Sequence, residues 1–186
     1  MNDKHNGYRN LYGGFLFCSI TAFLGCKRGV TPNQFKRIEI YRTQYIELNV
    51  PQELLPVKGN EAVFKKLFGD TPTGKASYGM MLQNTGTFID VKGMSEGKSR
   101  QVIFNAKPAG NNCADRLKSL AKAMPGSETE TIAGKEWLIS YHPEDRSLDF
   151  HRCERGAHWY LVFQDSKAPD RLTLLNWAKP SVESSR

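Results

Sequence analysis

The sequence contains no uncharged apolar run of the roughly 20 residues that a helix needs to cross a bilayer core. It also contains no internal repeat and no low-complexity segment, so a single globular unit is the simplest organisation. Cysteine and histidine are scarce, with four of each among 186 residues. Disulfide bonds and cysteine or histidine metal sites are therefore limited to combinations of these few residues.

The most apolar stretch, Gly13–Cys26, is short and follows a polar start that carries Lys4 and Arg9. A positive start, a short apolar segment and a small residue before the cleavage point are the features of an export signal. The segment Phe23-Leu24-Gly25-Cys26 resembles the lipobox of bacterial lipoproteins. That resemblance implies that residues 1–25 are a signal peptide and that Cys26 is acylated. The alternative is a buried apolar strand or helix at the N-terminus.

The remaining cysteines fit the same compartment. Cys18 would leave with the signal peptide, which leaves Cys113 and Cys153 in an oxidising space where pairing is the default. A bond closing a loop of about 40 residues stabilises a fold by about 4 kcal/mol in the chain-entropy model. We therefore expect a Cys113–Cys153 disulfide, with two separate buried thiols as the alternative.

The formal net charge is +7, and removal of the signal peptide would leave roughly +6 by the same count. A basic surface suits an acidic protein partner or anionic lipid headgroups, although it also suits a protein that is merely soluble. Behind an export signal, nucleic acid is not the expected partner.

Hydrophobic alternation and turn residues predict an α+β fold rather than a doubly wound parallel sheet. Its mostly antiparallel sheet consists of hairpins and a C-terminal meander, with two or three helices packed to one side. Residues 26–36 form the lipidated cysteine and a short tether, residues 37–180 a single domain, and residues 181–186 a frayed tail. The expected strands lie at 37–50, 78–83, 87–92, 101–105, 136–142, 148–153 and 157–164, joined in part by turns at 70–75, 93–100, 143–147 and 154–156.

Three helices are expected. Asn60 is a good N-cap for a helix over 61–68. A second helix is capped by Asn111 or Asn112 and ends at Pro125-Gly126. A third covers 169–177. Their apolar stripes are Val63, Phe64, Leu67 and Phe68 in the first, Leu117, Leu120, Ala121 and Met124 in the second, and Leu172 and Leu175 in the third.

One motif resembles that of serine hydrolases. Gly93-Met94-Ser95-Glu96-Gly97 matches G-x-S-x-G, and Asp145, Asp149, His151 and His158 follow in the order that hydrolases use. The motif requires a turn between a strand and a helix, whereas the residues after Gly97 read as a strand. We therefore expect turn glycines and no enzyme, and keep a small hydrolase using Ser95 as a minor alternative.

Two further patterns resemble cofactor sites. The segment 69–75 nearly matches a phosphate-binding loop, but Ala76 replaces the hydroxyl that would bind magnesium, and the segment follows a helix. His142, His151, Cys153 and His158 could form a zinc set, although His151-x-Cys153 is not a common ligand spacing. We expect neither metal nor other cofactor.

Charged loops on a rigid sheet are where a partner is usually bound. The candidate partner-binding residues lie in three such turns. They are Lys98, Arg100, Glu144, Asp145, Arg146, Glu154 and Arg155.

A small, basic, lipid-anchored, disulfide-bonded α+β domain without a catalytic set resembles the immunity lipoproteins of type VI secretion systems. Within that group the chain is similar to inhibitors of phospholipase D-type lipase effectors. The resemblance implies a periplasmic location on a membrane, the outer one in preference to the inner, and a toxin as partner rather than a small-molecule substrate. The alternative is a housekeeping lipoprotein of the envelope with a Mog1/PsbP-like domain.

Overall fold

The structure is a computed structural model that describes residues 34–41 and 44–183. The predicted signal peptide, Cys26 and most of the predicted tether lie outside these residues. Within them the chain forms nine strands, five α-helices and one 3-10 turn. In chain order these are β1 (Gln34–Tyr41), β2 (Gln44–Val50), β3 (Leu55–Pro56), α1 (Glu61–Phe68), α2 (Pro72–Gln83), β4 (Gly86–Ile89), α3 (Val91–Ser95), β5 (Arg100–Pro108), the 3-10 turn (Gly110–Asn112), α4 (Cys113–Ala123), β6 (Glu128–Ile132), β7 (Lys135–His142), β8 (Ser147–Glu154), β9 (Ala157–Asp165) and α5 (Arg171–Glu183).

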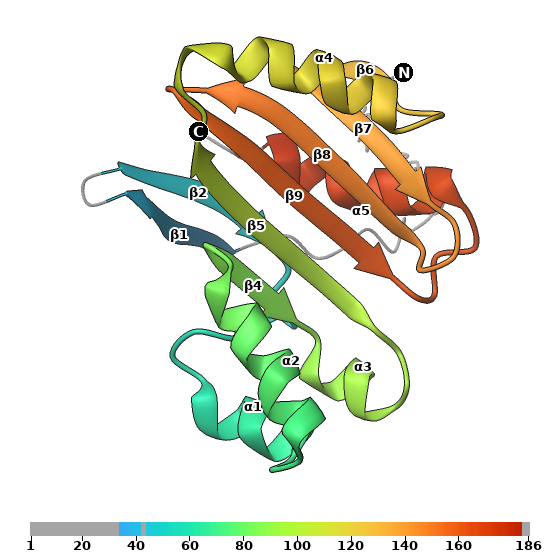
Figure 1. Ribbon diagram of the computed structural model, residues 1–186. Coiled ribbons are helices and arrows are strands. Elements are labelled where there is room, and N and C mark those ends of the chain that lie inside the picture. The colour runs from blue at the N-terminus through green and yellow to red at the C-terminus, as the bar shows by residue number, and fades with distance from the viewer. Residues whose placement is uncertain (1–33, 42–43, 184–186) are drawn as a thin grey trace, which may run out of the picture.

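Seven strands form one antiparallel sheet in the order β3-β4-β5-β9-β8-β7-β6, and β1 pairs with β2 in a separate ribbon (Figure 1). The α+β class and the mostly antiparallel sheet are therefore confirmed. The described helices number five rather than two or three. They also occupy more than one position: α5 and α4 lie on opposite faces of the sheet, and α1–α3 lie beside β4 (Figure 1).

One face of the sheet, which we call the core face, carries the hydrophobic core. Alternate residues of β8 and β9 point to it, and their aromatic rings meet edge to face at 5.4 Å between Phe150 and Phe163. The ribbon β1–β2 and α5 cover this face, so Ile46 and Trp177 pack into the same core. Trp137 and Ile139 of β7 and Trp159 of β9 are buried in the same core.

The core face also contains a deeply buried charged residue. Arg152 is only 3% exposed, and its guanidinium lies 4.3 Å from the ring centre of Trp137 and 4.2 Å from that of Trp159. Glu154 forms an ion pair with it. Burial lowers the pKa of Arg152 to about 10, and the cation is held by stacking and by its carboxylate partner.

The opposite face, which we call the histidine face, carries Asp149, His151 and Cys153 of β8 and Tyr160 of β9. Helix α4 lies over part of it, and a disulfide joins Cys113, the first residue of α4, to Cys153. The Cα atoms of the two cysteines are 5.8 Å apart, a normal spacing for such a bond. The predicted disulfide is confirmed.

The segment 78–83 was predicted to be a strand, and the 70–75 segment a loop; the structure instead forms α2 from Pro72. Thr71 begins this helix by accepting a hydrogen bond from the Gly74 N–H at 3.0 Å, and Pro72 occupies the first turn, where its missing N–H costs nothing. Tyr78 and Met81 pack against a second small core centred on Phe64. The apolar residues of 78–83 are compatible with either a strand or a helix, and the helix-start residues Thr71 and Pro72 favour the helix.

Two other elements differ from the prediction for similar local reasons. Strand β4 ends at Ile89 because Asp90 caps the short helix α3, which occupies the start of the turn predicted at 93–100. Strand β6 was not predicted, because its Glu-Thr-Glu-Thr sequence lacks an apolar alternation.

The C-terminal helix is longer than expected. It continues through Pro180 to Glu183, so Ser181 and Val182, assigned to the frayed tail, are buried. Leu172, predicted to face inward, is 63% exposed, while Leu175 is buried as expected. The buried stripe includes Leu174 and Ala178, one position out of phase with the predicted one.

The first prediction concerns the disulfide. Cys113 is the single buried residue of α4 among its described positions, so little apolar packing holds this helix to the sheet. We expect the Cys113→Ala/Cys153→Ala variant to lose about 2–4 kcal/mol of unfolding free energy. Hydrogen exchange should show lost protection in α4 and retained protection in β7–β9.

The wild-type protein under reducing conditions is the matched control, and it should unfold like the double variant. Equal stability of the oxidised and reduced protein would contradict the assignment of the bond as the main attachment of α4.

Candidate partner-binding surface

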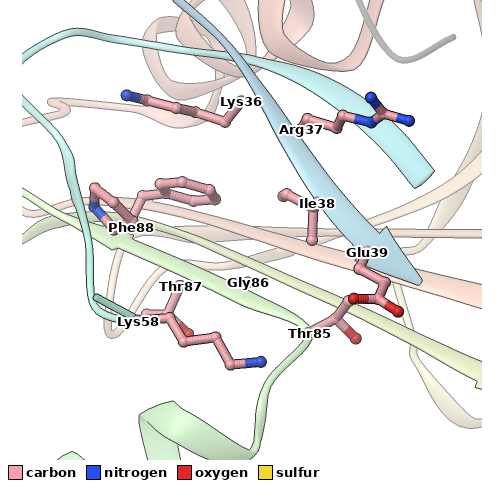
Figure 2. A pocket seen from close by; sticks show the side chains of 10 residues that line it. Lys36, Arg37, Ile38, Glu39, Lys58, Thr85, Gly86, Thr87 and Phe88 are labelled. Carbon is pink, nitrogen blue, oxygen red and sulfur yellow. The ribbon is translucent and has the colours of Figure 1, made fainter. Parts of the chain in front are cut away.

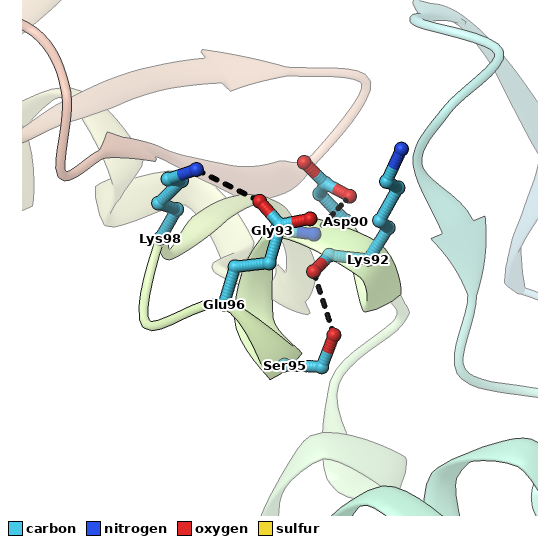
Figure 3. Close-up of polar contacts among 6 residues, drawn as sticks. All are labelled: Asp90, Lys92, Gly93, Ser95, Glu96 and Lys98. Atoms are coloured by element: carbon cyan, nitrogen blue, oxygen red, sulfur yellow. Dashed lines mark hydrogen bonds and ion pairs between the residues drawn. The ribbon is translucent and has the colours of Figure 1, made fainter.

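The segment 93–97 forms the end of α3 and the turn after it (Figure 3). The Ser95 hydroxyl donates a hydrogen bond to the Lys92 carbonyl at 2.8 Å, within its own helix. A side chain at Gly93 would overlap the Asp90 carboxylate that caps the helix, and Gly97 has a φ of 70°. Both glycines of the G-x-S-x-G match therefore have a structural reason to be glycine.

The histidines of the hydrolase pattern lie far from Ser95. His158 pairs with Lys107, seven residues along β5 from Arg100 and hence about 24 Å from the end of the strand that follows α3. His151 pairs with Tyr160, which pairs with Asn105, five residues along β5 from Arg100. It therefore lies about 17 Å along the strand direction and two strand spacings, about 10 Å, from that end of β5. A general base must come within hydrogen-bond reach of its serine, and neither histidine does.

The glycine-rich segment 69–75 joins α1 to α2. Gly69 ends α1 with a φ of 72°, and Lys75 lies 3.6 Å from Asp70. A side chain at Gly74 would overlap the carbonyl of Phe68, so glycine allows the two helices to approach closely. This geometry is that of a helix–helix connection rather than of a phosphate loop.

The zinc pattern does not assemble. Cys153 is in the disulfide, and the described residues contain no group of three or more His, Cys, Asp and Glu side chains that could hold a metal ion. Instead, the histidine face carries a chain of polar contacts. His151 Nδ1 lies 3.2 Å from His158 Nε2, the His151 ring stacks on Tyr160, and Tyr160 donates to Asp149 at 3.0 Å. His142 Nε2 lies 3.3 Å from the same carboxylate oxygen.

Burial governs the titration of these groups. It is the largest influence, ahead of the neighbouring histidine charges, in lowering the pKa of His151 to about 4. Burial, followed by the charges of Arg116 and Lys107, also lowers the pKa of His158. Burial raises the pKa of Asp149 despite its hydrogen bond from Tyr160. The face therefore keeps both histidines neutral near pH 7.

The predicted partner-binding residues fall into two groups at opposite ends of β8. Lys98, Arg100 and the β7–β8 turn with Glu144, Asp145 and Arg146 lie at one end; Glu154 and Arg155 lie in the β8–β9 turn at the other. The eight residues of β8 separate the two turns by about 25 Å. A single compact contact does not reach both.

Several members of this set are held by the fold. Arg100 forms ion pairs with Glu53 at 2.8 Å and Asp165 at 3.7 Å and stacks on Trp177. Glu154 pairs with Arg152 and with Lys135. The charges of Arg100 and Glu154 are largely compensated by these partners within the protein, so we assign both residues a structural role.

The β7–β8 turn is exposed and firmly attached. Its Asp145 carboxylate accepts a hydrogen bond from Ser147 at 2.7 Å, and its Asp145 carbonyl accepts one from Gln164 at 3.0 Å. Arg146, in the left-handed region with a φ of 52°, donates to the Ser166 carbonyl. Glu144 is exposed at the tip, with no hydrogen bond or ion pair to any other described residue.

Two hollows that the sequence did not reveal lie nearer the N-terminus. One, of about 360 Å³, lies between β1 and β4; Figure 2 shows Ile38 and Phe88 turned toward each other, with Lys58 and Glu39 at its edge. The other, of about 1090 Å³, lies between α1 and α3 beside β3. We call it the β3 groove; Leu55, Val63 and Val91 line it. Val63, placed by sequence in the apolar stripe of α1 with Phe64, lies at the groove and is exposed, whereas Phe64 is buried.

No family model and no curated protein matches the sequence. None of the helices in residues 34–41 and 44–183 is both long and apolar enough to cross a membrane.

The lowered histidine pKa values give a prediction about acid stability. Between pH 6.5 and about 4 the unfolded chain protonates His151 while the folded protein does not, so the unfolding free energy should fall as the pH falls. Asp149, with its raised pKa, acts in the opposite direction near its own titration. The His151→Gln variant should show a shallower pH dependence in denaturant titrations over this window.

Gln keeps a polar side chain without a charge, so the slope rather than the absolute stability is compared. An unchanged slope would contradict the assignment of a neutral, buried His151.

Proposed function

We propose that the protein is a lipid-anchored periplasmic protein that binds an antibacterial type VI secretion lipase effector and blocks it sterically. The lipobox-like segment supports the lipid anchor. The resemblance to type VI immunity lipoproteins supports the class of partner. The disulfide between α4 and β8 suits an oxidising compartment. The proposal involves neither catalysis nor a cofactor by this chain.

The observation that carries the mechanism is the attachment of the β7–β8 turn. Hydrogen bonds from Ser147, Gln164 and Arg146 fix its shape before any partner arrives. A loop that is already ordered loses little conformational entropy on binding, which favours tight inhibition. The exposed Glu144 then lies at the point that would enter the effector's substrate cleft.

The proposal is tested by deleting the gene in the bacterium that encodes it and competing the mutant with its parent on a solid surface. We expect contact-dependent killing of the mutant, restored to parental survival by this chain alone. Equal fitness of the two strains would contradict the immunity function and favour the housekeeping alternative.

The same assay locates the contact. Glu144→Arg should reduce protection strongly, because a reversed charge at the buried centre of an interface costs several kcal/mol. Glu136→Arg, the same change at the other end of β7 on an exposed residue, is the matched control and should protect fully. Arg155→Glu tests the β8–β9 turn. If Arg155→Glu loses protection and Glu144→Arg does not, the contact lies at the β8–β9 end of the sheet instead.

The anchor gives a separate prediction. Cys26→Ala removes the thiol that the lipobox would acylate, so the protein should leave the membrane fraction and lose the mass of the acyl groups. Mass spectrometry of the protein from fractionated cells measures both. A wild-type chain that retains Met1 and remains in the cytosol would contradict the lipoprotein assignment.

A further inference from the structure

The β3 groove combines apolar walls with unpaired positive charge. Leu55 is 36% exposed and Val63 40% exposed, two of the few large apolar side chains that the described residues leave at the surface. Leu67 lies one turn from Val63 on the same side of α1, and Val91 faces them from α3. The volume of about 1090 Å³ lies just above the usual range of small-molecule sites, so the groove has room for a long, flexible ligand.

The groove is lined by two carboxylates and two ammonium groups, which differ in their contacts within the protein. Its two carboxylates are engaged by the protein: Glu53 pairs with Arg100 at 2.8 Å, and Asp90 accepts the Gly93 N–H at 2.8 Å. Among the residues that the structure describes, the ammonium groups of Lys66 and Lys92 make no direct hydrogen bond or ion pair, although the charge of Lys92 contributes, after Lys98, to lowering the pKa of Glu96. Figure 3 shows Lys92 on the side of α3 away from the Lys98–Glu96 pair.

We propose that the β3 groove binds a long-chain fatty acid, with its acyl chain against Leu55, Val63 and Val91 and its carboxylate between Lys66 and Lys92. An acyl chain needs no hydrogen-bond partner, and the apolar walls offer none. The two ammonium groups of the lining supply the charge that the carboxylate needs, and the Ser95 hydroxyl is already committed to the Lys92 carbonyl. This inference is independent of the proposed effector binding.

A peptide fits the same groove less well. Strand addition would have to use β3, which is two residues long and contains Pro56, so it offers a short edge with a missing N–H. A bound peptide would therefore leave most of its backbone polar groups unpaired against apolar walls.

The test uses the full chain in phosphatidylcholine nanodiscs and a photoactivatable palmitate, with the labelled peptides read by mass spectrometry. We expect labelling concentrated on the peptides that contain Leu55 and Val63, and competed by unlabelled palmitate. Methyl palmitate, which lacks the charge, should compete several-fold less well.

Matched variants separate groove binding from surface adsorption. Val63→Asp should reduce groove labelling at least about tenfold, because it puts a charge against the acyl chain. Leu172→Asp, the same kind of change on the exposed side of α5, should leave it unchanged. Lys66→Gln should reduce labelling about two- to fivefold, as expected for a partly exposed ion pair, and Lys65→Gln on the same helix should not.

Labelling spread evenly over the chain, equal loss in Val63→Asp and Leu172→Asp, or equal competition by the methyl ester would overturn the proposal. Competition by an acidic apolar peptide but not by palmitate would overturn it in favour of a peptide site. Because Lys66 is exposed on α1, its variant keeps the test decisive if Val63→Asp does not fold.

Discussion

The seven-stranded sheet covers its two faces by different physical means, and the arrangement of the rest of the chain depends on this difference. On the core face, alternate side chains of β5, β7, β8 and β9 are apolar, and α5 and the β1–β2 ribbon pack against them. On the histidine face the same strands present Asp149, His151 and Tyr160, which offer α4 little apolar surface. Of α4 only Cys113 is buried, so a covalent bond supplies what packing does not. The ribbon itself approaches β4 at Gly86, where a side chain would come within 3.0 Å of Ile38.

The buried Arg152 affects which surface is available to a partner. A buried guanidinium is tolerated only when its charge is compensated, and here two indole faces and Glu154 provide that compensation. This requirement turns Glu154 inward and ties the β8–β9 turn to the core. The β7–β8 turn makes its hydrogen bonds through its backbone and through Asp145 and Arg146, which leaves Glu144 exposed at the tip. The β7–β8 and β8–β9 turns, both short and charged, therefore differ in the side chains that they expose to a partner.

Strand alternation was sufficient to predict the class of fold and the meander β7–β9, because it is a local property of the sequence. The disulfide could be predicted because only Cys113 and Cys153 remain beside the predicted signal peptide and lipobox. The helix α2 was missed because Tyr78–Gln83 is apolar without a clear period, and Asn84-Thr85-Gly86 resembles a hairpin turn; the deciding signal was Thr71-Pro72 at the helix start. Strand β6 was missed because its glutamates look like loop residues, whereas in the fold they pair with Arg171 and Lys179 of α5. The β3 groove could not be predicted, since Leu55, Val63 and Val91 come from three segments that only the tertiary structure brings together.

The net positive charge of the sequence is not concentrated in the folded domain. Between Gln34 and Glu183 the sequence has 21 Lys and Arg and 18 Asp and Glu, so most of the formal +7 lies outside the folded domain. Long-range attraction of an acidic partner by this domain is therefore weak at physiological salt, where the Debye length is about 8 Å. Lys27 and Arg28 directly follow the proposed acylated cysteine, where a positive charge would act on the membrane surface rather than on an effector. In the proposed arrangement, specificity for the partner thus depends on the shape of an ordered turn, and electrostatics serves the attachment of the chain.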